Sequence, residues 1–179
     1  MFSGVIKARA LVSELRLRRN GASFVLLLDQ PLGTVVGCSL CCSGVCLTVT
    51  KCCGQFVEVE AWCDSLRLSA LATTSRLEVL NVEAALTAAA QLHGHVVCGH
   101  VRCVVQLAAV DGAEAKVIKL RCPKWVTEGT LAPWSASLDG VSVTVAEAGY
   151  GWIQILLISY TLSATSLARL AIGRELSLE

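Results

Sequence analysis

The strongest constraint on the fold is an internal repeat with a spacing of 96 residues. The segment 43–50, SGVCLTVT, recurs in altered form as 139–146, DGVSVTVA. The same spacing aligns further identical residues, which are Leu66 with Leu162, Leu71 with Leu167, Leu80 with Leu176, and Glu83 with Glu179. Because one spacing relates positions along most of the chain, the sequence predicts two copies of one fold. We place these copies at residues 1–93 and 94–179.

Local patterns within each copy predict short strands. Residues 45–50 are rich in β-branched side chains, and residues 56–60 alternate between apolar and acidic side chains, as in a strand with one buried face. Turns between these segments are indicated by Gly33, Gly37, Gly44 and Gly54. Each half is therefore predicted to be a small barrel or sandwich.

Two further segments carry helix signals. Residues 64–67, and their repeat at 160–163, are predicted to begin a brief helix in which Asp64 caps the first backbone amides. Residues 82–90 are rich in alanine, which favours helix, whereas the repeat aligns 80–83 with the strand-like segment 176–179. We expect a strand there that passes into a short helix.

The composition excludes several classes of protein. Of the 179 residues, 54% are hydrophobic and 16% are charged, which excludes a disordered chain. The net charge is +1 and no basic run exceeds Arg18-Arg19, so we expect no nucleic-acid partner. The apolar runs fall short of the roughly 18 residues that a spanning helix needs, and the first residues resemble no secretory signal. We expect a cytoplasmic globular protein without a membrane partner.

Ten cysteines and three histidines are the candidate metal ligands. Cys38-x-x-Cys41, with four further cysteines close behind, could chelate zinc as part of an interaction module. Adjacent cysteines on a strand point to opposite faces, however, and a reducing compartment disfavours disulfides, so most are better interpreted as small buried apolar residues. His93, His95 and His100 could serve metal binding or proton transfer, or could lie in a polar crossover between the two copies.

Five segments taken together resemble a known family. They are MFSGVI at 1–6, Ser39 with GVCLTV at 44–49, LNVE at 80–83, GHVVCGHV at 94–101, and LDGVSVTV at 138–145. In this order, and spanning nearly the whole chain, they are similar to the motifs of the riboflavin synthase family of the alpha-chain type.

The resemblance implies an all-β fold of two tandem, pseudo-symmetric, six-stranded antiparallel Greek-key barrels with short helical turns. In that family a C-terminal helix gathers three chains into a homotrimer. The sequence ends at Glu179, before the position of that trimer helix. We therefore expect a homo-oligomer, most simply a trimer, that is weakened because the helix is missing.

The resemblance also implies a reaction. Two molecules of 6,7-dimethyl-8-ribityllumazine exchange a four-carbon unit and yield riboflavin and 5-amino-6-ribitylaminopyrimidinedione, without a metal or other cofactor. A duplicated barrel suits this chemistry, because two identical substrates held face to face react as an effectively unimolecular system. The alternative is a lumazine- or flavin-binding protein on the same fold that does not turn its ligand over.

The family's site residues are carried over onto matching positions of this sequence. Ser39, Cys46 and His100 are the implied catalytic residues, acting at the reactive ring carbon and in proton transfer. The implied substrate-binding residues are Phe2, Gly4 and Thr48 at the first barrel and Asp139, Ser142 and Thr144 at the second.

The sequence departs from the family pattern at three places. Cys98 replaces a usual serine, His93 replaces a usual glycine, and residues 133–135 stand where a lysine is normally found. Loss of the lysine and of the helix favours the binding protein, whereas retention of Cys46 and His100 favours the enzyme.

Overall fold

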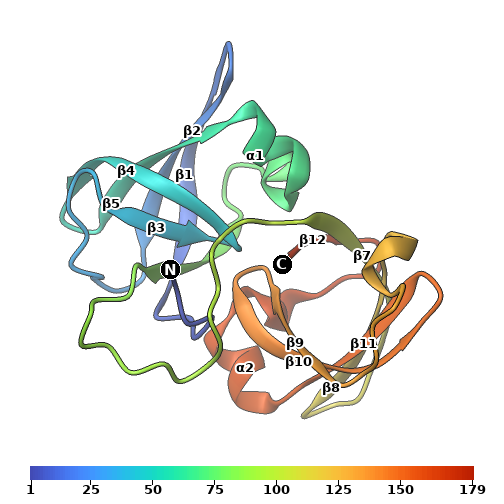
Figure 1. Cartoon of the computed structure of the whole chain (residues 1–179). Coiled ribbons are helices and arrows are strands. Elements are labelled where there is room, and N and C mark those ends of the chain that lie inside the picture. Colours follow the sequence, from blue (N-terminus) through green and yellow to red (C-terminus); the bar gives the residue numbers. More distant parts are fainter.

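The computed structural model describes residues 1–179 and consists of two closed, six-stranded antiparallel barrels that lie side by side (Figure 1). The strands of the first barrel are β1 (Ala8–Arg18), β2 (Gly21–Leu28), β3 (Ser39–Cys42), β4 (Val45–Cys53), β5 (Phe56–Trp62) and β6 (Val79–Ala84). Those of the second are β7 (Cys103–Asp111), β8 (Lys116–Arg121), β9 (Trp134–Leu138), β10 (Val141–Gly149), β11 (Trp152–Leu157) and β12 (Glu175–Leu178).

Both barrels have the same strand order. In the first, the order around the barrel is β1-β2-β5-β4-β3-β6, and the second repeats it with β7 to β12 in the corresponding places. Strands β4 and β10 begin 96 residues apart, as do β6 and β12. The predicted all-β double barrel is therefore confirmed, and the repeat read from the sequence is a repeat of whole strands.

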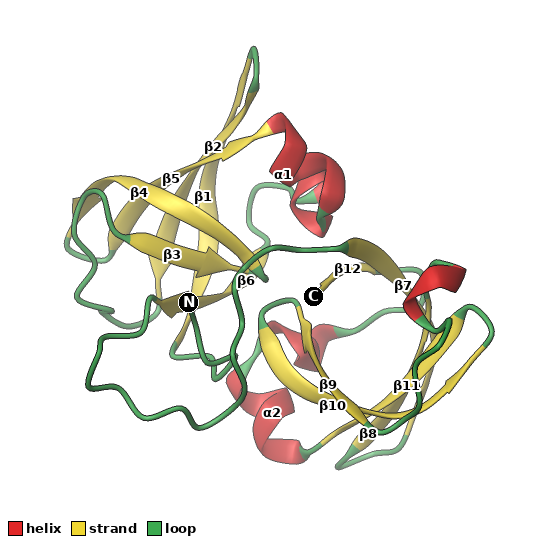
Figure 2. Cartoon of the chain, in the orientation of Figure 1, coloured by secondary structure: helices red, strands yellow, loops and turns green.

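Short helices follow the fifth strand of each barrel (Figure 2). In the first barrel they are α1 (Cys63–Leu68) and the 3-10 turn η1 (Ala70–Thr73), in the second α2 (Ser159–Ala164) and η3 (Ser166–Arg169), and a further turn, η2 (Lys124–Val126), follows β8. The predicted brief helices are confirmed. None of the helices combines the length and hydrophobicity needed to cross a membrane.

Two local predictions were wrong. Asp64 does not cap α1, because the capping position is Trp62 and makes no side-chain bond; Asp64 lies in the first turn and pairs with Arg67 at 3.4 Å. Residues 85–90 do not form a helix. The backbone amide of Ala85 donates to the Ser39 carbonyl and that of Leu86 to the Met1 carbonyl, so tertiary hydrogen bonds occupy the first amides of this segment, and a turn closed by the Ala90 amide and the Thr87 carbonyl follows.

The interior of each barrel is its own hydrophobic core, with 18 buried residues in the first and 17 in the second. Strand alternation decides which side chains enter it. On β4, Val45, Leu47 and Val49 are buried in the core, so the intervening positions, which include Cys46 and Thr48, lie on the outer face.

The cysteines follow the same alternation. Cys42 packs in the core of the first barrel, whereas its neighbour Cys41 packs on the outside in a small separate cluster. All ten cysteines are free thiols. No three His, Cys, Asp or Glu side chains come close enough together to hold a metal ion.

The two barrels meet at a pair of repeat-related hairpin turns. Ser43 and Gly44 join β3 to β4, Asp139 and Gly140 join β9 to β10, and all four residues have positive φ, as two-residue hairpin turns require. A Cβ atom at Gly44 would lie 3.0 Å from the Gly140 nitrogen, and one at Gly140 would lie 2.9 Å from the Gly44 nitrogen. Only glycine permits this approach, which places the pseudo-twofold axis between the turns.

Polar side chains next to this axis form hydrogen bonds from one barrel to the other. The Asn81 amide donates to the Asp139 carbonyl at 3.0 Å and accepts from the Ser166 amide at 2.7 Å. Ser177 stands 96 residues after Asn81, and its hydroxyl accepts from the Ala70 amide at 3.1 Å. The barrels are thus fixed against each other by repeat-related hydrogen bonds.

Candidate functional site

Hydroxyl side chains form a row on the outer face of the first barrel. Ser39 on β3 lies directly opposite Thr48 on β4, and Thr48 lies opposite Glu60 on β5. Ser39 is half-buried, whereas Thr48 and Glu60 are exposed. Two of the predicted site residues are therefore cross-strand neighbours on one open strand face, which we call the first face.

The second barrel carries the corresponding row. Ser135 on β9 lies opposite Thr144 on β10, and the two residues follow Ser39 and Thr48 by 96 positions. Ser135 was missed by the sequence analysis, although the repeat spacing applied to Ser39 would have found it. At the position that repeats Glu60 stands Leu156, which is 53% exposed. This second face therefore has the same hydroxyls on a more apolar surface.

Each face is bordered by a segment that crosses from the other half of the chain. The Cys46 amide donates to the Gly99 carbonyl at 2.9 Å, and the Ser142 amide donates to the Gly4 carbonyl at 2.7 Å. Both glycines have positive φ, and a Cβ atom at either would lie 2.7 Å from the Cβ of its partner. The crossing segments can approach β4 and β10 this closely only because the residues are glycines.

Two repeat-related carboxylates hold these crossing segments. Glu83 is buried and accepts hydrogen bonds from the Ser3 amide at 2.8 Å, the Ser3 hydroxyl at 2.6 Å and the Gly4 amide at 2.9 Å. Glu179 accepts from the amides of Cys98 and Gly99, each at 2.9 Å. A leucine–x–x–glutamate motif at the end of each copy thus fixes the border of each face.

The histidines are divided between the two faces. His100 is exposed and directly follows Gly99, which contacts Cys46 beside the first face. His95 is half-buried, and its Nδ1 lies 2.6 Å from the Ser142 hydroxyl beside the second face. Burial lowers the pKa of His95, partly opposed by the Glu179 carboxylate, so the neutral imidazole that can share a hydrogen bond with the serine hydroxyl is favoured.

His95 was not selected as a site residue from the sequence. Subtracting the repeat spacing from its position leads to no residue of the chain, so the repeat offered no counterpart. Its place beside Ser142 depends on the crossing of the segment 94–99 over the second barrel, where the His95 amide donates to the Ser3 carbonyl.

Two predicted substrate-binding residues are buried and are not exposed on a face. Phe2 lies in the small cluster with Cys41 and Val97, against which Cys46 packs beside the first face, and its backbone pairs with that of Val97. Asp139 is buried in the turn at the pseudo-twofold axis. Its Oδ1 accepts from the Ser177 amide at 2.7 Å, and its Oδ2 lies 3.9 Å from Arg174 Nη2. Phe2 thus joins the two halves of the chain, whereas the Asp139 carboxylate bonds within its own half and only the Asp139 carbonyl, which accepts from Asn81, is hydrogen-bonded to the other.

Burial raises the pKa of Asp139 from 3.8 to about 7, against the opposing effects of the Ser177 amide and Arg174; the neighbouring Glu78 carboxylate raises it further. The folded chain therefore retains a proton that the unfolded chain loses, and stability should fall as the pH rises from about 4 to about 7. Asp139→Asn should remove this loss, because asparagine tolerates the left-handed turn and supplies an oxygen for the Ser177 amide.

Urea denaturation of both chains across this range provides the measurement. The free energy of unfolding of Asp139→Asn, minus that of the native chain, should increase with pH. Between about pH 4 and pH 7 the increase should be a few kcal/mol, at most about 4. A difference that stays constant with pH would show that the Asp139 carboxyl does not carry the raised pKa.

The two faces are open surfaces. Five cavities with volumes of about 290 to 470 Å³ are lined by none of Ser39, Cys46, Thr48, Ser142 and Thr144. Because the faces are open, a ligand on either one would be covered on one side only. A lumazine-sized molecule normally binds in a concave site that buries most of its surface, so a second surface would be needed to cover it.

Comparisons with known proteins agree with this architecture. Residues 98–179 match the family model described as lumazine binding domain. The whole chain aligns with riboflavin synthases at 28% identity over 92% of the protein from Brucella abortus (strain 2308), and at 29% over 92% of that from Mycobacterium tuberculosis (strain H37Rv). The riboflavin synthase of Escherichia coli (strain K12) is 26% identical over 86% of its length.

Solved structures of the protein LumP have the same fold. The complex of LumP with riboflavin superposes with a TM-score of 0.91 and 17% identity, and that with 6,7-dimethyl-8-ribityllumazine with a TM-score of 0.89. Each comparison covers all of this chain and 98% of LumP. Two like barrels, a lumazine-binding signature over residues 98–179 and relatives matched from end to end together support the riboflavin synthase family as the family of this chain.

Proposed function

We propose that the chain is a riboflavin synthase, which converts two molecules of 6,7-dimethyl-8-ribityllumazine into riboflavin and 5-amino-6-ribitylaminopyrimidinedione. The observation that carries this proposal is the duplicated strand face, with Ser39 opposite Thr48 and Ser135 opposite Thr144. A reaction between two identical molecules needs two similar sites, and one chain here provides both. The names of its relatives support the same activity.

The open faces suggest how the two substrates meet. In our proposal the first face of one copy turns toward the second face of another, so that each face covers the ligand bound to its partner. Exposed apolar residues at the end of each fifth strand, Trp62 and Ile158, would be covered in the same contact. Repeating one such heterologous contact around a ring closes it, and three copies form the ring implied by the family resemblance.

Positioning accounts for most of the proposed catalysis. Two rings held in stacked, reactive geometry gain an effective molarity that free lumazines in solution lack. The four-carbon unit leaves its donor as two carbon–nitrogen bonds break and joins its acceptor as two carbon–carbon bonds form. The two products together contain all atoms of the two substrates, so the exchange requires neither an oxidant nor a reductant.

Side chains on the faces supply hydrogen bonds and proton transfer in this scheme. On the first face, Ser39 acts at the reactive ring carbon with Cys46 beside it, Thr48 binds the ring, and His100 carries a proton. On the second face, Ser142 and Thr144 bind the other molecule beside Gly4, and we add His95 because its Nδ1 contacts the Ser142 hydroxyl. We propose that Phe2 and Asp139 contribute by fixing the crossing segment and the turn.

A non-catalytic lumazine or flavin carrier is the second candidate. It is favoured by the likeness to LumP, whose structures contain lumazine, riboflavin or flavin mononucleotide. The replacement of Glu60 by Leu156 at the repeated position also makes the two faces unequal.

Incubating the purified chain with 6,7-dimethyl-8-ribityllumazine separates these candidates. We expect riboflavin to appear by its absorbance, and a mass in solution above that of one chain. The paired variants Ser39→Ala with Thr48→Val, and Ser135→Ala with Thr144→Val, should each lower the rate at least about tenfold, since each removes hydrogen bonds to one of the two substrates. Ligand binding without any riboflavin would select the carrier and overturn the enzyme.

A further inference from the structure

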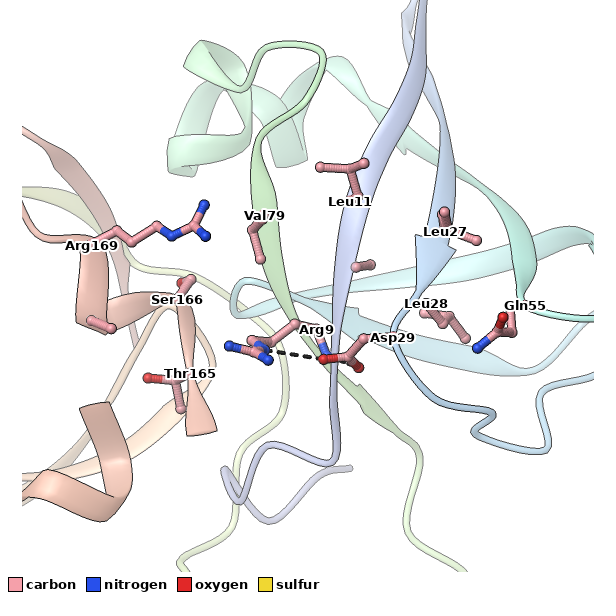
Figure 3. A pocket seen from close by; sticks show the side chains of 12 residues that line it. Arg9, Leu11, Leu27, Leu28, Asp29, Gln55, Val79, Thr165, Ser166 and Arg169 are labelled. Atoms are coloured by element: carbon pink, nitrogen blue, oxygen red, sulfur yellow. Dashed lines mark hydrogen bonds and ion pairs between the residues drawn. The ribbon is translucent and has the colours of Figure 1, made fainter. Parts of the chain in front are cut away.

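A cleft between the two barrels lies apart from both faces. Its volume is about 430 Å³, within the range of small-molecule sites. Strands β1, β2 and β6 of the first barrel form one side, and the end of α2 with η3 of the second barrel forms the other (Figure 3). Any molecule bound here would contact both halves of the chain.

One wall of the cleft carries an unpaired positive charge. Arg9 and Asp29 neutralise each other, because the Arg9 amide and Nε both donate to the Asp29 carboxylate, at 2.9 and 3.1 Å. Arg169, which extends into the view from η3 in Figure 3, makes no ion pair with any carboxylate of the chain. The side chains that line the cleft therefore carry a net charge of +1, which Arg169 supplies.

A neutral polar group on the same wall also lacks a partner. The Ser166 side chain is 4% exposed, and its hydroxyl oxygen makes no hydrogen bond. The neighbouring Thr165 hydroxyl, by contrast, donates to the Thr161 carbonyl at 2.7 Å and accepts from the Leu167 amide. A buried hydroxyl without a partner is uncommon. The Ser166 oxygen has almost no accessible surface in this conformation, so its hydroxyl would have to turn toward the cleft to donate to an acceptor on a ligand.

The opposite wall carries an apolar patch beside the neutralised Arg9–Asp29 pair and Gln55. The patch is formed by Leu11, Leu27 and Val79, which Figure 3 shows on strands β1, β2 and β6. A cleft with an apolar patch and one unpaired guanidinium matches a molecule with an apolar body and a single anionic group.

The internal repeat provides a comparison within the same chain. At the other junction of the barrels, a second cleft is lined by Ala70, Thr73 and Glu175, the repeat counterparts of Ser166, Arg169 and Val79. That cleft also contains Glu78 and Asp139 against a single arginine, Arg174. The barrel junction therefore forms without an arginine or a serine at these positions, so packing alone does not require Arg169 and Ser166.

We propose that the cleft at η3 is a second small-molecule site, which binds an organic molecule with an apolar body and one anionic group, either a carboxylate or a phosphate. Arg169 holds the anionic group, the Ser166 hydroxyl turns to donate to it, and Leu11, Leu27 and Val79 cover the apolar body. Since both barrels contribute to the cleft, the bound molecule stabilises their relative orientation and raises the melting temperature of the chain.

Titration with three probes that share one ring system tests this site. 1-Naphthoate and 1-naphthyl phosphate test the carboxylate and the phosphate, and 1-naphthol is the neutral reference. We expect at least one anion to bind about tenfold or more tightly than 1-naphthol, with the difference shrinking at high salt. Backbone amide shifts in NMR spectra should change around residues 9–11, 79 and 165–169. Which anion binds more tightly identifies the class of the natural ligand.

Variants separate this site from general binding to the surface. Arg169→Gln should abolish the preference for anions, and Ser166→Ala, which copies Ala70 of the other junction, should weaken anion binding a few-fold. Arg67→Gln removes an exposed arginine from α1 and should leave binding unchanged, as should Ser39→Ala on the first face. Equal binding of the anions and 1-naphthol, or unchanged anion binding by Arg169→Gln, would overturn the proposal whether or not the chain makes riboflavin.

Discussion

Replacing Glu83 with alanine is expected to lower the free energy of unfolding by about 3–5 kcal/mol, because three hydrogen-bond donors lose their acceptor. The carboxylate is 1% exposed and accepts from the amides of Ser3 and Gly4 and from the Ser3 hydroxyl. Without it, water reaches these groups only if the crossing segment leaves its place against β10. Urea denaturation of the full chain, followed by tryptophan fluorescence, measures the loss.

The repeat supplies a matched control for this variant. Glu179→Ala removes the counterpart carboxylate, which accepts only two hydrogen bonds, from amides that are exposed or half-buried. Its cost should be smaller, about 1–2 kcal/mol. Glu83→Gln keeps one acceptor oxygen and should lie between the native chain and Glu83→Ala. If Glu179→Ala destabilises the chain as much as Glu83→Ala, burial of the donors is not the cause.

Replacing His100 with alanine is expected to reduce riboflavin formation by about a hundredfold, the lower end of what general acid–base catalysis contributes. His100 is exposed beside the first face, so the variant should unfold at nearly the same urea concentration as the native chain. Initial rates at saturating lumazine, together with lumazine binding by fluorescence, separate a loss of proton transfer from a loss of binding.

His93 is the control for this effect. It is exposed in the same connecting segment and makes no side-chain hydrogen bond, so His93→Ala should retain the native rate. His95→Ala tests the second imidazole, whose contact with Ser142 gives it a defined place beside the second face. A native rate for His100→Ala, with a reduced rate only for His95→Ala, would move the proton transfer to the second face.

The repeat and the strand alternation could be predicted from the sequence because both are local or periodic properties. Cys46 and Thr48 are outward-facing because Val45, Leu47 and Val49 face inward, and a period of two settles that choice within β4. The helix at residues 63–68 was likewise predicted from its own residues. The absence of a helix at residues 85–90 was not, since it depends on acceptors at Ser39 and Met1, far away in the chain.

The two like halves, their short strands, and the alternating faces at residues 45–50 and 56–60 can be predicted from the residue pattern alone, because a repeat and a period of two are visible in neighbouring or regularly spaced residues. The burial of Phe2 and Asp139, the contact of His95 with Ser142 and the unpaired Arg169 beside Ser166 are visible only in the folded chain. These contacts depend on how segments far apart in the sequence cross and how the barrels pack, which no local pattern encodes.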